Sequence, residues 1–281
     1  MNDLVEASFV RRDIATPLGR LGVYVGGQGP ALLFWPSLLM SSSMWSAQAK
    51  HFMDRYRVVL IDPPGHGSSE PLRAGFTFED CVACVVRILD ELGIERGSFV
   101  GNSWGGMIGG TLVAMHPERI TSAVLMNCTA SAVGIRQKME YGFLVALVRM
   151  FGRVPVQLEG IAVRAFTGPT TERDRPEVIG RIRAALKQVD GHSVHWAIRS
   201  VVPRRPDQHE LLRRIRTPVL VVAGGEDRTF PVHETRKMAD AIPAARFEVL
   251  DGVAHLAGLE SPERTSLLID QFLRQHRDPG T

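Results

Sequence analysis

Gly101-Asn102-Ser103-Trp104-Gly105-Gly106 is the most informative segment of this 281-residue chain. It carries the pattern G-x-S-x-G between an apolar run at 97–100 and a predicted helix at 107–115. A serine on a sharp strand-to-helix turn presents its hydroxyl at the end of a sheet, and the flanking glycines let the strand and the helix pack closely. The amino end of the helix would favour an oxyanion nearby. The stretch therefore indicates a nucleophilic serine, provided that a base and an acid follow.

Strands and helices alternate on both sides of this stretch. Short apolar runs predict strands at 9–14, 21–25, 31–35, 57–61, 98–101, 120–126, 218–223 and 246–250. Such alternation with helical segments is typical of an α/β fold with a mostly parallel eight-stranded sheet flanked by helices.

The alternation is interrupted between residues 132 and 211. This stretch has no clear buried strand and instead contains amphipathic helical segments at 137–151, 158–167, 175–189 and 192–202. We interpret it as an inserted helical cap. The predicted organisation is a first part of the core at 1–131, the cap at 132–211 and a second part of the core at 212–281.

Composition and charge exclude several classes of protein. Apolar residues make up 44% of the chain, charged residues 22%, and the net charge is +3, as in an ordinary globular protein with no nucleic-acid function. No apolar run is long enough to span a membrane, and Met1–Glu6 lacks the pattern of a secretory signal. The dense arginines at 204, 205, 213, 214 and 216 are expected on a solvated helix face.

The cysteines and histidines indicate neither disulfides nor a metal site. Cys81 and Cys84 form C-x-x-C inside a predicted helix, but no second pair with ligand spacing accompanies them. We expect both in the core, in a cytoplasmic protein. The histidines at 66, 192, 195 and 233 form no convincing ligand set, so no metal and no cofactor is predicted.

A serine that transfers an acyl group needs a base and an acid that orients the base. Two later strands end in suitable loops. The strand at 218–223 runs into Glu226-Asp227, and the strand at 246–250 leads to His255. The order Ser103, Asp227, His255 is the order expected of a triad on this scaffold.

Through these motifs, the chain resembles the α/β-hydrolase superfamily over almost its whole length. The matching stretches are 62–68, 101–106, 223–227 and 255–263. The resemblance implies Ser103 as the nucleophile, His255 as general base and then general acid, and Asp227 as its partner. Glu226 and Asp251 remain as alternative acids.

The oxyanion loop departs from the family pattern. Members commonly carry His-Gly after the third strand, whereas this chain has Phe34-Trp35-Pro36-Ser37-Leu38-Leu39-Met40. Some enol-lactone hydrolases of the superfamily are similar here, and the comparison places the first oxyanion amide at Leu38. We therefore expect an oxyanion hole formed by the amides of Leu38 and Trp104, with Leu39 as the alternative to Leu38.

The same loop predicts an apolar substrate pocket. Trp35, Leu38, Leu39, Met40 and Trp104 could surround the acyl group, although packing in the core is the alternative for each. Residues of the cap are candidates for a lid over the pocket, with ordinary helix packing as their alternative: Met139, Phe143, His195 and Trp196.

These observations favour a serine hydrolase that cleaves a small to medium carboxylic ester or lactone through an acyl-enzyme. One alternative is hydrolysis of a carbon–carbon bond in a vinylogous diketone acid produced by ring cleavage. Another is a ligand-binding protein of the same fold with weak or no turnover. The expected partner is a small-molecule ester or lactone, with no nucleic acid and no membrane, and the sequence allows a homodimer.

Overall fold

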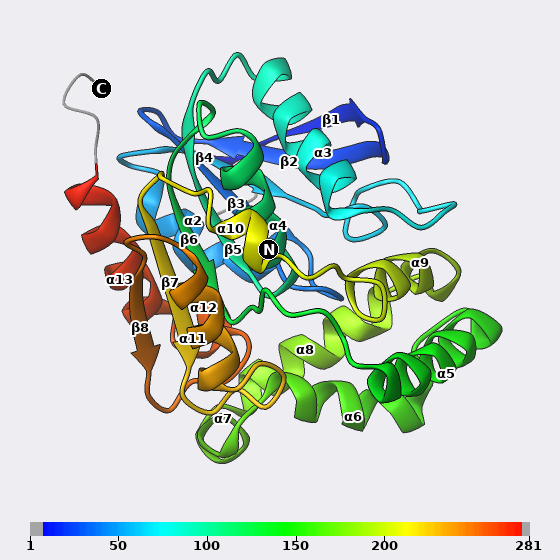
Figure 1. The fold of residues 1–281 in the computed structure, drawn as a ribbon. Coiled ribbons are helices and arrows are strands. Elements are labelled where there is room, and N and C mark those ends of the chain that lie inside the picture. Colours follow the sequence, from blue (N-terminus) through cyan, green and yellow to red (C-terminus); the bar gives the residue numbers. More distant parts are fainter. Residues whose placement is uncertain (1–7, 277–281) are drawn as a thin grey trace.

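A single eight-stranded sheet organises the protein (Figure 1). The computed structural model describes residues 8–276, apart from the side chains of residues 135–137, 144 and 156–157. The strands are β1 (Val10–Thr16), β2 (Gly19–Gly26), β3 (Ala31–Trp35), β4 (Arg57–Ile61), β5 (Gly97–Asn102), β6 (Ile120–Met126), β7 (Val219–Gly224) and β8 (Arg246–Leu250).

The strand order is β1-β2-β4-β3-β5-β6-β7-β8. The β1–β2 and β2–β4 pairs are antiparallel, and all later pairs are parallel. The predicted α/β-hydrolase fold with a mostly parallel sheet is thus confirmed.

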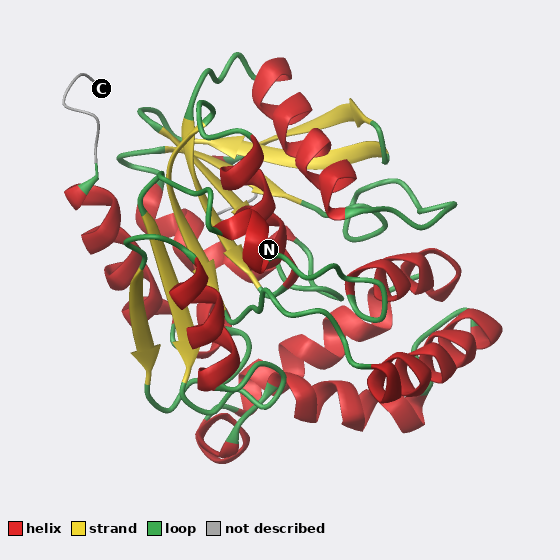
Figure 2. Cartoon of the chain, in the orientation of Figure 1, coloured by secondary structure: helices red, strands yellow, loops and turns green. Residues whose placement is uncertain are grey.

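Helices cover both faces of the sheet (Figure 2). Adjacent residues of β3 show how the two layers arise: Leu33 and Trp35 belong to one apolar cluster, whereas Leu32 and Phe34 belong to the other. Side chains alternate between the faces of a strand, so a strand buried on both sides reads as a continuous apolar run. This is why the central strands were recognisable in the sequence.

The helices divide between the two layers. One cluster includes α3 (Phe78–Glu91), α4 (Trp104–Met115), the single turn α10 (His209–Leu212) and α11 (Val232–Ala241). The other includes the 3-10 helix η1 (Ser42–Trp45), α2 (Ser46–Phe52), α12 (Ala257–Glu260) and α13 (Pro262–Gln275).

Of the helices between β6 and β7, the first five form the helical insertion, which gathers at one end of the sheet (Figure 1). They are α5 (Ile135–Phe151), α6 (Val156–Phe166), α7 (Pro169–Asp174), α8 (Pro176–Gln188) and α9 (Gly191–Val201). The sequence predicted four of them and treated Gly168-Pro169 only as a break. The missed helix α7 has Pro169 in its first turn, where the absent N–H costs nothing. The domain boundaries at 132 and 211 stay a prediction.

The three cysteines are buried thiols within the described part of the chain. Cys81 and Cys84 lie in the core on α3, and burial raises the pKa of both thiols. The expectation about a secretory signal at residues 1–6 lies outside the described residues. Among residues 8–276, no helix is both long and apolar enough to cross a membrane.

Close packing of α4 against β3 generates a stability prediction. A Cβ added at Gly105 would lie 2.2 Å from the carbonyl oxygen of Trp35, and backbone must then shift. We expect Gly105→Ala to lower the free energy of unfolding by about 3 kcal/mol or more. Urea-induced unfolding measures the change.

Gly180→Ala is the matched control, because a Cβ at this position on α8 meets nothing within 4 Å. It should leave the free energy of unfolding unchanged or raise it by up to about 1 kcal/mol. Equal effects of the two substitutions would contradict the proposed steric constraint.

Candidate active site

Ser103 occupies a strained turn between β5 and α4. Its backbone has φ 55° and ψ −109°, and it precedes the first residue of the helix. The turn is anchored because the amide of Ser103 donates to the carbonyl of Met126 on β6 at 2.8 Å. A Cβ at Gly101 would come within 2.2 Å of the backbone of Gly105, so glycine at 101 permits the tight turn. The hydroxyl-bearing residue is thereby held at the carboxyl end of the sheet, the usual ligand-binding edge.

The loops after β7 and β8 bring Asp227 and His255 together. His255 Nδ1 lies 2.9 Å from Asp227 Oδ2, and both side chains are buried. The second oxygen of Asp227 accepts from the amides of Thr229 and Phe230 at 2.8 and 3.0 Å. Asn127 Nδ2 adds a bond of 3.1 Å to Oδ2. This carboxylate is therefore fully hydrogen-bonded and fixed in its orientation toward the imidazole.

The two alternative acids are placed elsewhere. Glu226 accepts from the amide and the hydroxyl of Thr170 at 2.8 and 2.6 Å. Asp251 lies exposed on the loop after β8. Among the three candidates, Asp227 is the one that contacts His255.

The other imidazole nitrogen of His255 is left without a partner. Nε2 is buried and makes no hydrogen bond to any described residue. His255 and Ser103 line the same cavity, although no hydrogen bond joins them. Such bonds are often long in an empty site and tighten when substrate binds. With Nδ1 donating to Asp227, Nε2 is the acceptor for a proton from the cavity.

Packing and a buried carboxylate hold the His255 loop. The imidazole stacks on Phe166 with an interplanar angle of 5° and a centroid distance of 5.4 Å, and Phe230 contacts it at 5.6 Å. The carboxylate of Glu260 accepts from the amides of Ala254 and Leu256, on either side of the histidine, at 3.0 and 2.8 Å. Glu260 lies in one of the matched motifs, but its role was not recognisable from the sequence, because the contact arises only where α12 folds back under the loop.

The oxyanion loop has two amides available for a ligand. Within residues 8–276, the amides of Leu38 and Trp104 donate to no acceptor. The amide of Leu39 is occupied, since it donates to His66 Nε2 at 3.1 Å. The alternative donor named from the sequence is therefore engaged, whereas the pair of Leu38 and Trp104 is not.

His66 fixes this loop in place. Its Nδ1 lies 2.9 Å from the carbonyl of Pro64 and donates to it, which leaves Nε2 as the acceptor for Leu39. Leu39 has φ 67°, a left-handed conformation that leucine rarely adopts. Burial lowers the pKa of His66 to about 4, so the neutral form prevails at neutral pH. The sequence indicated only a structural loop here, and His66 is accordingly a positioning residue.

A cavity of about 240 Å³ opens onto Ser103 and His255. Leu38 and Leu39 line one side, as expected from the sequence. The helical insertion supplies most of the remaining wall, which is apolar apart from Tyr141: Val148, Val154, Leu158, Ile161, Ala162, Ala165, Phe166, Ile198 and Val201. The volume lies just below the usual range for ligand pockets, which indicates a small ligand.

Two pocket residues expected from the oxyanion loop lie elsewhere. Trp35 is fully buried and packs edge-on against Trp104, because alternation along β3 directs it under α4. Met40 is buried in the apolar cluster on the opposite face of the sheet, with Met44 and Trp45. The Trp104 side chain is likewise core, stacked on Phe76, so only its backbone faces the site.

The residues predicted to form a lid do not line this cavity either. The side chains of Phe143 and Met139 are 66% and 69% exposed on the outer surface of α5. Trp196 packs against the core beneath Arg199. Periodicity identified the helices but not which face of each helix turns toward the cavity.

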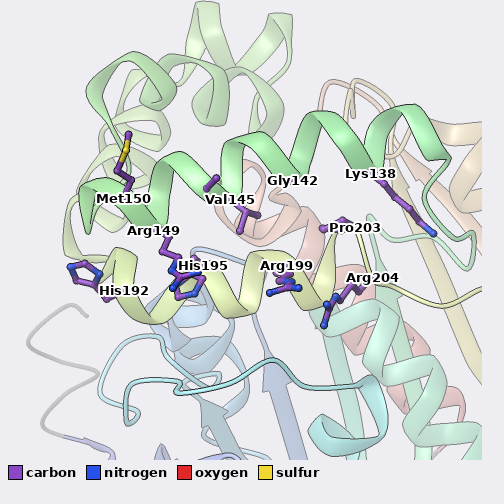
Figure 3. A pocket seen from close by; sticks show the side chains of 11 residues that line it. Lys138, Gly142, Val145, Arg149, Met150, His192, His195, Arg199, Pro203 and Arg204 are labelled. Atoms are coloured by element: carbon purple, nitrogen blue, oxygen red, sulfur yellow. The ribbon is translucent and has the colours of Figure 1, made fainter.

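A second cavity, of about 780 Å³, lies outside the reaction site between α5 and α9 (Figure 3). It contains none of Ser103, Asp227 and His255. Its lining is strongly basic and includes Lys138, Arg149, His192, His195, Arg199 and Arg204. Despite its larger volume it contains no serine, cysteine or carboxylate among its lining residues, so the smaller cavity is the candidate reaction site. Within the described residues, no three His, Cys, Asp or Glu side chains cluster as metal ligands would.

Comparison with known proteins agrees with this geometry. The sequence profile of the family described as alpha/beta hydrolase fold matches residues 30–262. A 3-oxoadipate enol-lactonase of Acinetobacter baylyi is 30% identical over 88% of this chain and 89% of its own length. A 2-hydroxymuconate semialdehyde hydrolase of Pseudomonas putida is 27% identical over 98% of both chains.

A solved structure extends the likeness to three dimensions. A thermophilic esterase from Thermogutta terrifontis, solved with malate bound, superposes with a TM-score of 0.88. It is 26% identical and covers 95% of this chain and 100% of its own. The chain belongs to the α/β-hydrolase fold family, and within that family it is esterase- and lactonase-like.

The buried His66 generates a prediction about pH. Because its pKa is about 4 when folded and about 6.5 when unfolded, the unfolded chain binds one more proton between these values. Stability is thus full above pH 6.5 and falls as the pH drops toward 4, by about 3 kcal/mol from this residue. We expect His66→Gln to have a shallower loss of unfolding free energy over this range than the unsubstituted protein.

Chemical denaturation at a series of pH values measures this difference. The control is His233→Gln, since the side chain of His233 is 70% exposed. It should parallel the unsubstituted protein. If His66→Gln also does so, His66 is not the buried neutral group described above.

Proposed function

We propose that the protein is a serine hydrolase that cleaves a small to medium carboxylic ester or lactone through an acyl-enzyme. The observation that carries the proposal is the 2.9 Å contact between Asp227 and His255, with the free Nε2 of His255 on the cavity that also holds Ser103. The enol-lactonase and esterase relatives support the ester and lactone class.

Acylation follows from these positions. Ser103 Oγ attacks the substrate carbonyl carbon while its proton passes to His255 Nε2. Asp227 keeps the imidazole in the required tautomer and stabilises its positive charge. The amides of Leu38 and Trp104 would donate to the oxyanion of the tetrahedral intermediate, and each such donor contributes about 10²–10³ in rate. Collapse breaks the carbon–oxygen bond, and His255 returns the proton to the leaving alkoxide.

Deacylation reverses these roles with water. His255 Nε2 removes a proton from water, the hydroxide attacks the acyl-enzyme carbonyl, and Ser103 leaves with the proton. The products are a carboxylic acid and an alcohol. For a lactone, both groups remain in one molecule, a hydroxy acid or its keto tautomer.

Carbon–carbon bond hydrolysis is the second candidate. The muconate semialdehyde hydrolase that aligns over 98% of both chains favours it. In such enzymes we expect a glycine-rich oxyanion loop and a tryptophan just after the catalytic histidine. This chain instead has Pro36-Ser37-Leu38-Leu39 in the loop and Leu256 after His255. We therefore rank it second. A ligand-binding protein without turnover is third, and a cytoplasmic location and a homodimer remain predictions from the sequence.

Hydrolysis of p-nitrophenyl esters and lactones by the protein and by Ser103→Ala tests the proposal. We expect kcat/KM to fall by at least about 10⁴-fold in the variant, since residues of a triad act as a unit. Ser98→Ala is the control, because Ser98 lies at the other end of the same strand and bonds to Thr121 and Ser122. It should retain activity.

Two other outcomes would contradict the proposal that the protein hydrolyses an ester or lactone. Labelling of Ser103 by a fluorophosphonate without turnover of any ester or lactone would favour the carbon–carbon reaction. Neither labelling nor turnover would favour the ligand-binding protein.

A further inference from the structure

Arg205 brings a positive charge into the catalytic cavity. It follows α9, is half-buried, and lines the same cavity as Ser103 and His255. Burial lowers the pKa of its guanidinium, although an arginine remains protonated at any physiological pH. The sequence placed this residue among arginines of a solvated face, and the structure corrects that expectation for Arg205.

The contacts of Arg205 account for only part of its hydrogen-bonding capacity. Nε donates to the carbonyl of Ser131 at 2.8 Å, and Cζ lies 5.3 Å from the ring centroid of Phe230. Within the described part of the chain, no carboxylate forms an ion pair with the guanidinium, and its terminal nitrogens have no hydrogen-bond acceptor. Two acidic groups influence the guanidinium, the phenol of Tyr141 and then the carboxylate of Glu234. Glu234 already binds Ser131 Oγ at 3.2 Å and Lys237 Nζ at 2.7 Å.

Such a charge is unfavourable unless a ligand compensates it. The cavity that Arg205 lines is mostly apolar, with Met107, Val201 and Val202 in its wall, and it has no carboxylate among its lining residues. Withdrawing a cation from water without a counter-charge costs free energy, and the bond to Ser131 would need only a neutral donor. The cation–π contact with Phe230 and the bond to Ser131 offset part of this cost, and neither uses the terminal nitrogens as hydrogen-bond donors.

We propose that Arg205 is the specificity-determining residue for a carboxylate on the substrate, which places the substrate among small anionic esters or lactones. This inference rests on the proposed hydrolysis of an ester or lactone. A guanidinium can bind a carboxylate through two parallel hydrogen bonds, which fixes orientation as well as charge.

The geometry also limits the size of the substrate. The ring of Phe230 contacts both the guanidinium of Arg205, at 5.3 Å, and the imidazole of His255, at 5.6 Å. One aromatic ring thus separates the carboxylate-binding group from the catalytic base. In a cavity of about 240 Å³, the carboxylate and the scissile carbonyl belong to one compact molecule.

The outer surface of the helical insertion supports an anionic substrate independently. The outer cavity between α5 and α9 has Lys138, Arg149, Arg199 and Arg204 in its lining and no acidic residue among the lining residues (Figure 3). Helix α9 takes part in both cavities, through Arg199 outside and Ile198 inside. A surface of one sign of charge raises the local concentration of the oppositely charged substrate.

The test compares anionic and neutral substrates of similar size. The acyl-side pair is mono-p-nitrophenyl glutarate and p-nitrophenyl hexanoate. The leaving-group pair is 3-carboxyphenyl pentanoate and phenyl pentanoate. We expect a higher kcat/KM for the anion in one pair, which identifies the side of the scissile bond that carries the carboxylate.

Substitution then assigns the preference to the guanidinium. Arg205→Gln should lower the ratio of kcat/KM for the anion over that for the neutral ester by about 30-fold, the effect of losing a charge-assisted hydrogen-bonded pair. The change should be mainly in KM, and Arg205→Lys should restore part of it. Arg214→Gln is the matched control, because Arg214 is exposed, belongs to the same dense set of arginines and lines neither cavity, and it should keep the ratio within about threefold.

The failure of this inference is distinguishable from failure of the proposed function. Ser103-dependent hydrolysis with the same ratio in the unsubstituted protein and in Arg205→Gln overturns the role of Arg205 and leaves the hydrolase intact. If no ester is cleaved, calorimetric titration with glutarate and with glutaramide still decides. Glutarate should bind more tightly than glutaramide to the unsubstituted protein but not to Arg205→Gln, and equal binding of glutarate to both proteins overturns the inference.

Discussion

The candidate active site is built around the close approach of α4 to the strands beneath it. The backbones of β3, β5 and α4 meet where Gly101 and Gly105 have no side chains to separate them. The chain therefore leaves β5 and enters the helix through a single residue, Ser103, with φ 55°. The strain is maintained because the core on both sides of the turn is closely packed and the Ser103 amide is bonded to β6. The hydroxyl and the amide of Trp104 thus share one rigid support.

The remaining groups of the site come from loops that follow other strands at the same edge of the sheet. Asp227, His255 and the oxyanion loop follow three different strands, and each loop has its own anchor. Glu260 accepts from the amides around His255, and His66 accepts from Leu39. These anchors satisfy backbone donors that burial would otherwise leave unpaired. The same bonds leave the amide of Leu38 free, so the availability of one donor depends on the engagement of its neighbour.

Several parts of this arrangement were predictable from local pattern. Strands buried on both faces read as apolar runs, and each of the eight predicted strands overlaps an observed one. The positions of the acid and the histidine after β7 and β8 followed from the order of motifs. The residues that line the cavity were harder to predict from the sequence. Four candidates do not line it: Trp35, Met40, Phe143 and Trp196. An aromatic residue in an apolar stretch fits a core and a pocket equally well, and one strand position or one helix rotation decides between them.

The fold class and the chemistry-bearing residues near the carboxyl ends of the strands follow from the sequence, because both depend on residue types at short spacings. Which of these groups meet depends on the tertiary structure. It paired Asp227, rather than Glu226 or Asp251, with His255, and it engaged Leu39 while leaving Leu38 free. It also separated Arg205, which lines the catalytic cavity, from Arg204 beside it. Neighbouring residues of the same type, such as Leu38 and Leu39 or Arg204 and Arg205, cannot be distinguished by their chemistry in the sequence. The direction of each side chain is set by elements that pack against it from far along the chain.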